Sequence, residues 1–130
     1  MTDSELQERI LTETGMKYAE LADALSFNRA HISHVKSGKK AILAEYKMRC
    51  VERLRRPGYR FNIFWFEDPE KHPFWVPEDY WLNQFDPEFQ VLAQMKPDFM
   101  EALKRVARLP PEKQERWLNM ARDLFNLGEG

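Results

Sequence analysis

Residues 28 to 34 carry side chains that can hydrogen-bond to the edges of DNA bases, at helical spacing. An Asn can pair twice with adenine, an Arg can pair twice with guanine, and a small apolar side chain can contact the thymine methyl group. Residues 29, 33 and 36 follow the i, i+4, i+7 spacing of one helix face. We therefore predict a base-contacting set of Asn28, Arg29, Ala30, Ser33 and His34. The alternative is a solvated helix on the surface of an unrelated bundle.

Cationic and polar residues flank this set on both sides. Lys17 and Tyr18 open the preceding predicted helix, where exposed N–H groups and the helix dipole favour a phosphate. The predicted phosphate-contacting residues that follow the set are Lys36, Ser37, Lys39 and Lys40. Contacts of this kind determine affinity and orientation but not sequence preference.

Two short helices joined by a tight turn are expected to position both sets. The first has one apolar face, formed by Tyr18, Leu21, Ala22 and Leu25. The turn covers residues 26–28, whose polar ends can cap a helix. In the second helix only three positions are apolar, and Ile32 and Val35 are expected to point inward. Gly38 is expected to end this helix, and the short turn makes the two helices cross steeply.

The same stretch resembles the helix-turn-helix of the lambda-repressor/Cro superfamily, often called the Xre family. The matching elements, in order, are Ala19-Glu20-Leu21-Ala22, Leu25, Ile32-Ser33, Gly38-Lys39 and Ile42. The match covers roughly residues 5–55, under half of the chain. It implies an N-terminal four-helix domain whose third helix enters the major groove. Because the family includes repressors, antitoxins and regulators of modification systems, the resemblance is more specific for fold than for function.

Basic residues are concentrated in one part of the chain. The net charge is −1, but residues 26–60 carry ten Lys/Arg and two acids, and residues 61–130 carry eight Lys/Arg and thirteen acids. A basic block in an otherwise acidic chain is what a local polyanion site needs, which favours double-stranded DNA as the partner. The single Cys50 excludes an internal disulfide and fits a reducing cytosol. Without an apolar run of ~18–20 residues, we expect a cytoplasmic protein with no membrane contact.

The rest of the first half is predicted from its periodicity. A helix is expected over residues 4–14 with Ser4 as its cap, and another over residues 42–55. The arginines of the second of these helices can reach the DNA backbone or pair with the acidic half, and the pattern leaves both open. Pro57-Gly58 breaks the chain where the family continues with a fifth helix.

An aromatic segment follows this break. Alternation from Tyr59 to Trp65 predicts one short strand, for which pairing across a dimer is an option because a lone strand needs a partner. Residues 66–86 are expected to form an ordered loop anchored on the core by its aromatic side chains. Base stacking by these aromatics is disfavoured by the many neighbouring acids.

Helices are expected again at the C-terminal end. They cover residues 87–95, a segment from Pro97, and a last helix after Pro110-Pro111. The predicted apolar face of the last helix is formed by Trp117, Leu118, Ala121, Leu124 and Phe125. This segment resembles a helix found after many Xre-type domains. We predict a helix-turn-helix domain over 1–56 and an aromatic linker with C-terminal helices over 57–130, serving dimerisation or partner binding.

The predicted fold class is therefore mainly α, with an aromatic-rich loop and a short strand between two groups of helices. The sequence contains no phosphate-binding Gly-rich loop, nucleophile elbow or metalloprotease motif, so we expect neither an enzyme nor a cofactor. His31 and His34 have no obvious third ligand, so we expect no metal. The favoured function is a bacterial or phage transcriptional repressor that binds a palindromic operator as a homodimer. The alternative is an antitoxin-like module whose residues 57–130 sequester a protein partner.

Overall fold

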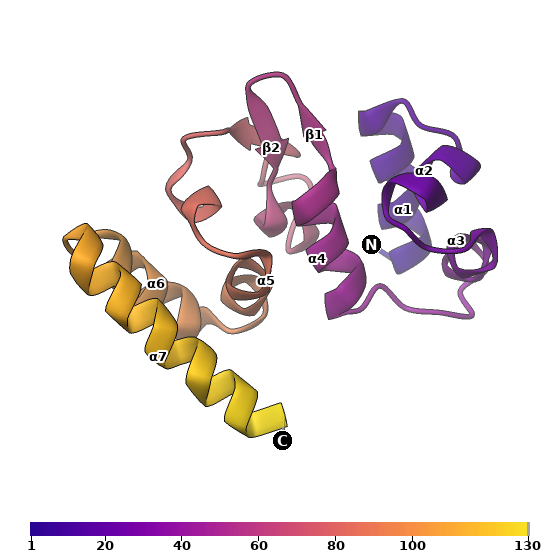
Figure 1. Ribbon diagram of the computed structural model, residues 1–130. Coiled ribbons are helices and arrows are strands. Elements are labelled where there is room, and N and C mark those ends of the chain that lie inside the picture. The colour runs from indigo at the N-terminus through magenta and orange to yellow at the C-terminus, as the bar shows by residue number, and fades with distance from the viewer. Residues whose placement is uncertain (130) are drawn as a thin grey trace.

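The computed structural model describes residues 1–129, with the side chains of residues 1–123. This part of the chain forms seven α-helices, two 3₁₀ helices and a small antiparallel sheet (Figure 1). The mainly helical character confirms the predicted fold class in outline. Each helix in this part of the chain is too short or too polar to cross a bilayer.

Four helices form the first part of the molecule: α1 (Asp3–Thr14), α2 (Tyr18–Ala24), α3 (Arg29–Lys36) and α4 (Ala44–Arg53). The predicted cap of α1 is wrong, because Thr2 Oγ1, and not Ser4, accepts a hydrogen bond from the Glu5 N–H at 3.1 Å. Helices α2 and α3 lie where the apolar spacing predicted them, with Ile32 and Val35 buried. Helix α4 ends earlier than predicted, since Leu54 already has extended backbone.

The turn between α2 and α3 contains a strained residue, Ser26, with φ of +56°. A side chain with a Cβ costs about 1–2 kcal/mol in this left-handed region, and a glycine does not. We expect Ser26→Gly to raise the free energy of unfolding by about 0.5–1 kcal/mol, because the relief of strain exceeds the entropy that glycine adds to the unfolded chain. Urea unfolding measures this. Ser26→Ala is the control, since it keeps the Cβ, and equal stability of the Gly and Ala variants would contradict the prediction.

The break at Pro57-Gly58 is a hairpin turn. It joins β1 (Arg55–Arg56) to β2 (Tyr59–Phe61), and β2 also pairs antiparallel with β3 (Trp75–Pro77). Pro followed by a Gly at φ of +79° is typical of the two central residues of a type II turn. The predicted strand therefore has both of its partners within the same chain. Pairing across a dimer is not needed to complete the sheet.

The alternation predicted as far as Trp65 is wrong beyond Phe61. The chain turns there into a 3₁₀ helix, η1 (Ile63–Phe66), in which all four side chains are buried. Asn62 enforces the turn, because its Oδ1 accepts from the Phe64 N–H at 3.2 Å and its Nδ2 donates to the Pro73 carbonyl at 3.0 Å. A run of consecutive buried residues cannot be a strand with one solvated face.

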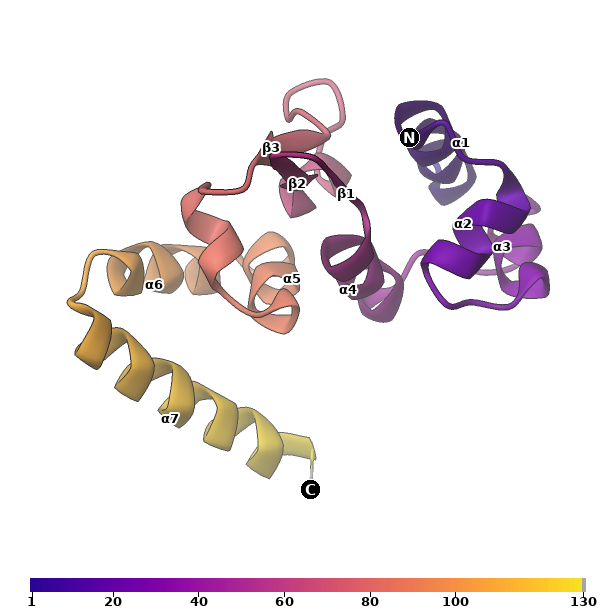
Figure 2. The same ribbon diagram turned by 45° about the horizontal axis from the view of Figure 1, so that its top comes forward.

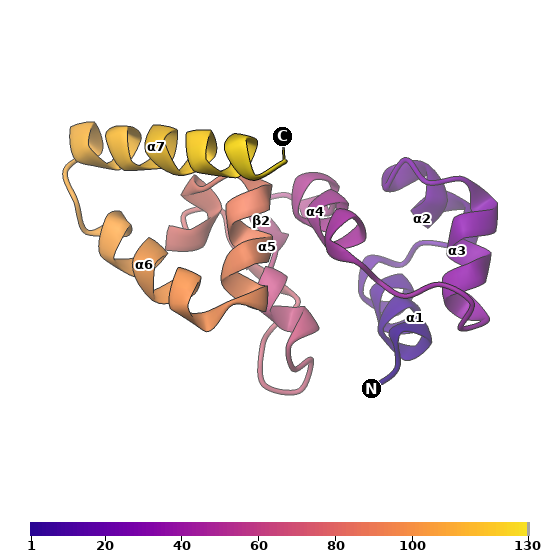
Figure 3. The same cartoon turned by 90° about the horizontal axis from the view of Figure 1, so that it is seen from below.

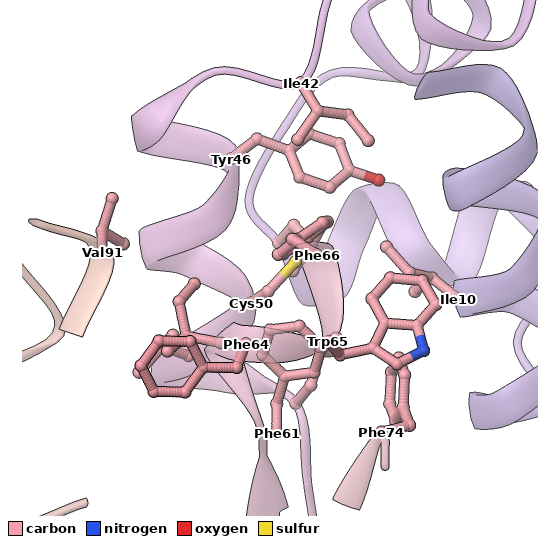
Figure 4. Packing of buried hydrophobic residues seen from close by; sticks show 14 of the residues in the cluster. Ile10, Ile42, Tyr46, Cys50, Phe61, Phe64, Trp65, Phe66, Phe74 and Val91 are labelled. Carbon is pink, nitrogen blue, oxygen red and sulfur yellow. The ribbon is translucent and has the colours of Figure 1, made fainter. Parts of the chain in front are cut away.

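The aromatic segment forms the centre of the core. Edge-to-face ring contacts, with centroids 4.9–6.1 Å apart, join the four side chains of Phe61, Trp65, Phe66 and Phe74. Figure 4 shows these rings beside Cys50 and Tyr46 of α4. The predicted role of the aromatic residues as anchors is confirmed for Phe74 and Phe85, which are both buried.

Three helices complete the chain after the 3₁₀ helix η2 (Trp81–Gln84): α5 (Pro87–Met95), α6 (Pro97–Ala107) and α7 (Pro111–Glu129). Trp117 of α7 lies beside the rings of Phe89 and Phe99, and Arg122 forms an ion pair with Asp86 at the start of α5. The predicted core positions Leu124 and Phe125 lie outside the described side chains.

Helix α4 lies in the middle of the molecule. Figures 2 and 3 show α1–α3 on one side of it and α5–α7 on the other. One cluster of buried side chains runs from Leu6 of α1 to Ala121 of α7. The predicted boundary between residues 56 and 57 falls inside the β1–β2 hairpin, so the two halves share a sheet as well as a core.

Candidate nucleic-acid interface

A shallow groove between the start of α2 and the outer face of α3 brings several predicted residues together. It has a volume of about 300 Å³ and is lined by Tyr18, Ala19, Arg29, Ser33 and Lys36. The side chains of Arg29, Ser33 and Lys36 are exposed, as their i, i+4, i+7 spacing predicted. The Lys36 ammonium lies 4.6 Å from the centre of the Tyr18 ring. The predicted base-contacting residues Arg29 and Ser33 therefore lie in one groove with two predicted phosphate-contacting residues, Tyr18 and Lys36.

Asn28 has a second task at the start of α3. Its Oδ1 accepts a hydrogen bond from the His31 N–H at 2.7 Å and so caps the helix. A bidentate pair with adenine needs this same oxygen as the acceptor for the base amino group. Breaking the cap costs about 1 kcal/mol. The free Nδ2 donates without that cost, so the geometry favours a single hydrogen bond from Asn28 to a base acceptor or phosphate.

Ala30 and His34 lie on α3 outside the groove lining. Ala30 is exposed, whereas His34 is half-buried. The His34 carbonyl accepts from the Ser37 hydroxyl at 3.2 Å and from the Lys40 N–H at 3.1 Å, which ties the end of α3 to the loop that follows. His34 is five residues from Arg29, a rotation of about 140° around the helix. The structure therefore separates His34 from the side of α3 that faces the groove.

The predicted phosphate-contacting residues surround α3. Lys17, Ser37, Lys39 and Lys40 are all exposed. The Lys17 N–H at the start of α2 donates to Glu20 Oε1 at 3.2 Å, so a carboxylate already occupies part of this helix end. A phosphate near α2 would therefore depend on the Lys17 ammonium more than on the backbone N–H groups named in the sequence prediction.

Helix α1 holds α3 through its backbone, a role that the sequence pattern did not reveal. Gln7, fully buried, donates through Nε2 to the Ile32 carbonyl at 3.0 Å and accepts through Oε1 from the Tyr46 hydroxyl at 3.0 Å. Burial raises the pKa of the Tyr46 phenol, which keeps it protonated and a donor. Ser4 donates to the Lys36 carbonyl at 2.7 Å. Polar side chains from behind thus fix the orientation of α3 and leave its outer face free.

A second set of contacts holds the turn between α2 and α3. Arg49 of α4 donates to the carbonyls of Leu25 at 3.2 Å and Ser26 at 2.8 Å, and its guanidinium lies 4.2 Å from the centre of the Phe27 ring. His31 also stacks on Phe27, with the two ring centres 4.1 Å apart. Arg49 therefore stabilises the turn between α2 and α3.

The environment of His31 favours the neutral form of its imidazole. Burial lowers its pKa, and the positive charges of Lys40 and Arg49 lower it further. In the structure its ring is half-buried and belongs to the aromatic stack under the first turn of α3.

Other candidate features lie away from α3. A pocket of about 530 Å³ lies in the second half and is lined mainly by aromatic and apolar side chains, among them Phe64, Tyr80 and Trp81. Burial raises the pKa of the Cys50 thiol, in agreement with a core role. Among the side chains that the structure describes, those of residues 1–123, no group of three or more is placed to bind a metal ion. Comparison of the chain with protein-family models, curated proteins and solved structures found no match.

Proposed function

We propose that the protein is a cytoplasmic, sequence-specific regulator that binds double-stranded DNA, with α1–α4 as a lambda-repressor-like helix-turn-helix domain. The observation that carries the proposal is the groove that combines exposed Arg29 and Ser33 with Tyr18 and Lys36. Side chains that can contact bases lie next to side chains that can contact phosphate. Helix α3 buries only Ile32 and Val35, and α1 and α4 support it from behind.

The proposed active form is a homodimer that represses by covering a promoter. A helix of eight residues contacts only a few base pairs, and two-fold pairing supplies the remaining contacts. The expected operator is a palindrome with half-sites about one helical turn apart. Selection of binding sites from a random duplex pool at about physiological salt tests this directly. Enrichment of such a palindrome supports the proposal, and failure to enrich any sequence overturns it and directs attention to a protein partner of residues 57–130.

Arg29→Ala should reduce affinity for the selected operator by about 1–3 kcal/mol and relax the preference at one base position. The reason is the loss of a bidentate pair with guanine. Arg29→Lys is the matched control, because it keeps the charge but not the planar fork, and it should also lose the preference. Equal losses on operator and random duplex, measured by fluorescence anisotropy, would show that Arg29 contacts only the backbone.

Lys40→Ala should weaken binding to operator and random DNA alike. One phosphate contact fewer lowers the slope of log K against log salt by about 0.9. Titrations at four or more salt concentrations measure this slope. A variant with an unchanged slope, or with a changed base preference, would remove Lys40 from the phosphate-contacting set.

A further inference from the structure

Three arginines of the β1–β2 hairpin and one arginine just before it have no ion-pair partner in the described part of the chain. They are Arg53 at the end of α4, Arg55 and Arg56 on β1, and Arg60 on β2. None of them forms an ion pair within the described part of the chain, although Arg9, Arg49 and Arg122 each do. In the described part of the chain, these four residues therefore do not form the ion pairs with the acidic second half that the sequence left open as one alternative.

The strand register brings two of these arginines together. Arg55 lies directly opposite Arg60 on the neighbouring strand. The neighbouring pair, Leu54 and Phe61, is hydrogen-bonded, because the Phe61 N–H donates to the Leu54 carbonyl at 3.2 Å. Hydrogen-bonded and non-hydrogen-bonded pairs alternate along an antiparallel ladder. The Arg55–Arg60 pair is therefore of the non-hydrogen-bonded kind, in which the side chains approach most closely. Like charges placed directly opposite destabilise a sheet. Arg60 Nε is in addition buried without a hydrogen-bond partner.

The other face of the hairpin is stiffened by aromatic rings. The Arg56 guanidinium lies 5.3 Å from the centre of the Tyr59 ring and 5.8 Å from that of Trp75. The Arg55 side chain is folded back, with Nε donating to the Glu52 carbonyl at 3.2 Å. Its two terminal nitrogens form no hydrogen bond within the part of the chain that the structure describes. The hairpin is thus a short ribbon that presents several guanidinium groups at a cost in stability.

The hairpin lies next to the segment that leads into α2. A pocket of about 220 Å³ is lined by Arg55 and Arg56 together with Thr14 and Met16. Thr14 and Met16 belong to the short segment just before Lys17 and Tyr18. Glu13 also lines this pocket but forms no ion pair with either arginine. The basic surface of the hairpin therefore continues the edge of the candidate interface at which α2 begins.

We propose that the β1–β2 hairpin is a second DNA-contacting element, whose arginines bind phosphates of the duplex that flank the site contacted by α3. The inference rests on the proposed function. Guanidinium groups match phosphate geometry in a bidentate manner, and a bound phosphate removes the repulsion between Arg55 and Arg60. The hairpin enlarges the footprint of each subunit and adds affinity without adding sequence preference.

The test compares Arg55→Gln/Arg56→Gln with the charge-matched control Arg105→Gln/Arg108→Gln, whose exposed arginines lie at the end of α6. Loss of two phosphate contacts should lower the salt slope by about two and affinity at physiological salt on the order of tenfold, for operator and random duplex alike. The control should match the wild type. Arg53→Gln, which lies outside both strands, gives a second variant whose folding does not depend on the sheet, with an expected slope change of about one.

The outcomes distinguish the contribution of the hairpin to DNA binding from that of α3. Flanking protection in a hydroxyl-radical footprint should disappear in the hairpin variant, while the selected sequence stays the same. Wild-type binding with an unchanged slope in both Arg55→Gln/Arg56→Gln and Arg53→Gln overturns this inference and leaves the proposed function standing. Wild-type protein that binds no duplex overturns both. Tighter binding to single-stranded RNA than to duplex DNA assigns the hairpin to another nucleic acid and also overturns the inference.

Discussion

Trp65→Ala should lower the free energy of unfolding by about 3–5 kcal/mol, the cost of removing a large buried aromatic side chain. Trp65 is 2% exposed and makes edge contacts with Phe61, Phe66 and Phe74. Since these rings also cover α4, the loss should extend to the helices that carry the candidate interface. Urea unfolding followed by circular dichroism measures the stability, and anisotropy with duplex DNA measures the interface.

Trp75→Ala is a matched control for this prediction. Trp75 is half-buried on β3, so its removal leaves a smaller cavity and should cost less. A single unfolding transition that moves to lower urea in Trp65→Ala supports one cooperative core. Two transitions, with DNA binding kept through the first, would show that α1–α4 fold independently of the aromatic segment.

Gln7→Leu should lower the free energy of unfolding by about 2–3 kcal/mol, although Leu is close to Gln in size. The change removes the donor to the Ile32 carbonyl and leaves the buried Tyr46 hydroxyl without its acceptor. Because Ile32 belongs to α3, affinity for the operator should fall as well. Thermal unfolding and operator titration measure the two effects.

A double-mutant cycle tests whether Gln7 and Tyr46 act as a pair. Tyr46→Phe alone should be destabilising, since it leaves Gln7 Oε1 without a donor, but Gln7→Leu/Tyr46→Phe should cost less than the sum of the single changes. The expected coupling is about 0.5–3 kcal/mol. Strictly additive losses would mean that the hydrogen bond contributes nothing to stability.

Much of the first half could be predicted because its elements are local. Apolar residues at helical spacing identify α2 and the two inward positions of α3, and the spacing of Arg29, Ser33 and Lys36 predicts one shared side. A helix face is determined by residues three and four apart, so the pattern is contained in the sequence itself.

The supports of the interface could not be predicted in this way. Gln7 and Ile32 are 25 residues apart, and Arg49 reaches carbonyls more than 20 residues away. Backbone carbonyls carry no sequence signal, so their partners emerge only when the chain has folded. The predicted strand as far as Trp65 failed for a related reason, because alternation of aromatic and polar residues cannot show that Asn62 turns the chain.

The central position of α4 makes the two halves of the molecule thermodynamically coupled. On one side Arg49 clamps the turn before α3, and on the other Lys47 donates to Gln94 of α5 at 2.8 Å. Under the proposed function, a ligand or protein that binds the second half and displaces α4 would therefore change the affinity for DNA. By linkage, DNA then changes the affinity for that ligand by the same factor. Helix α4 thus offers the proposed DNA-binding surface a route to allosteric control.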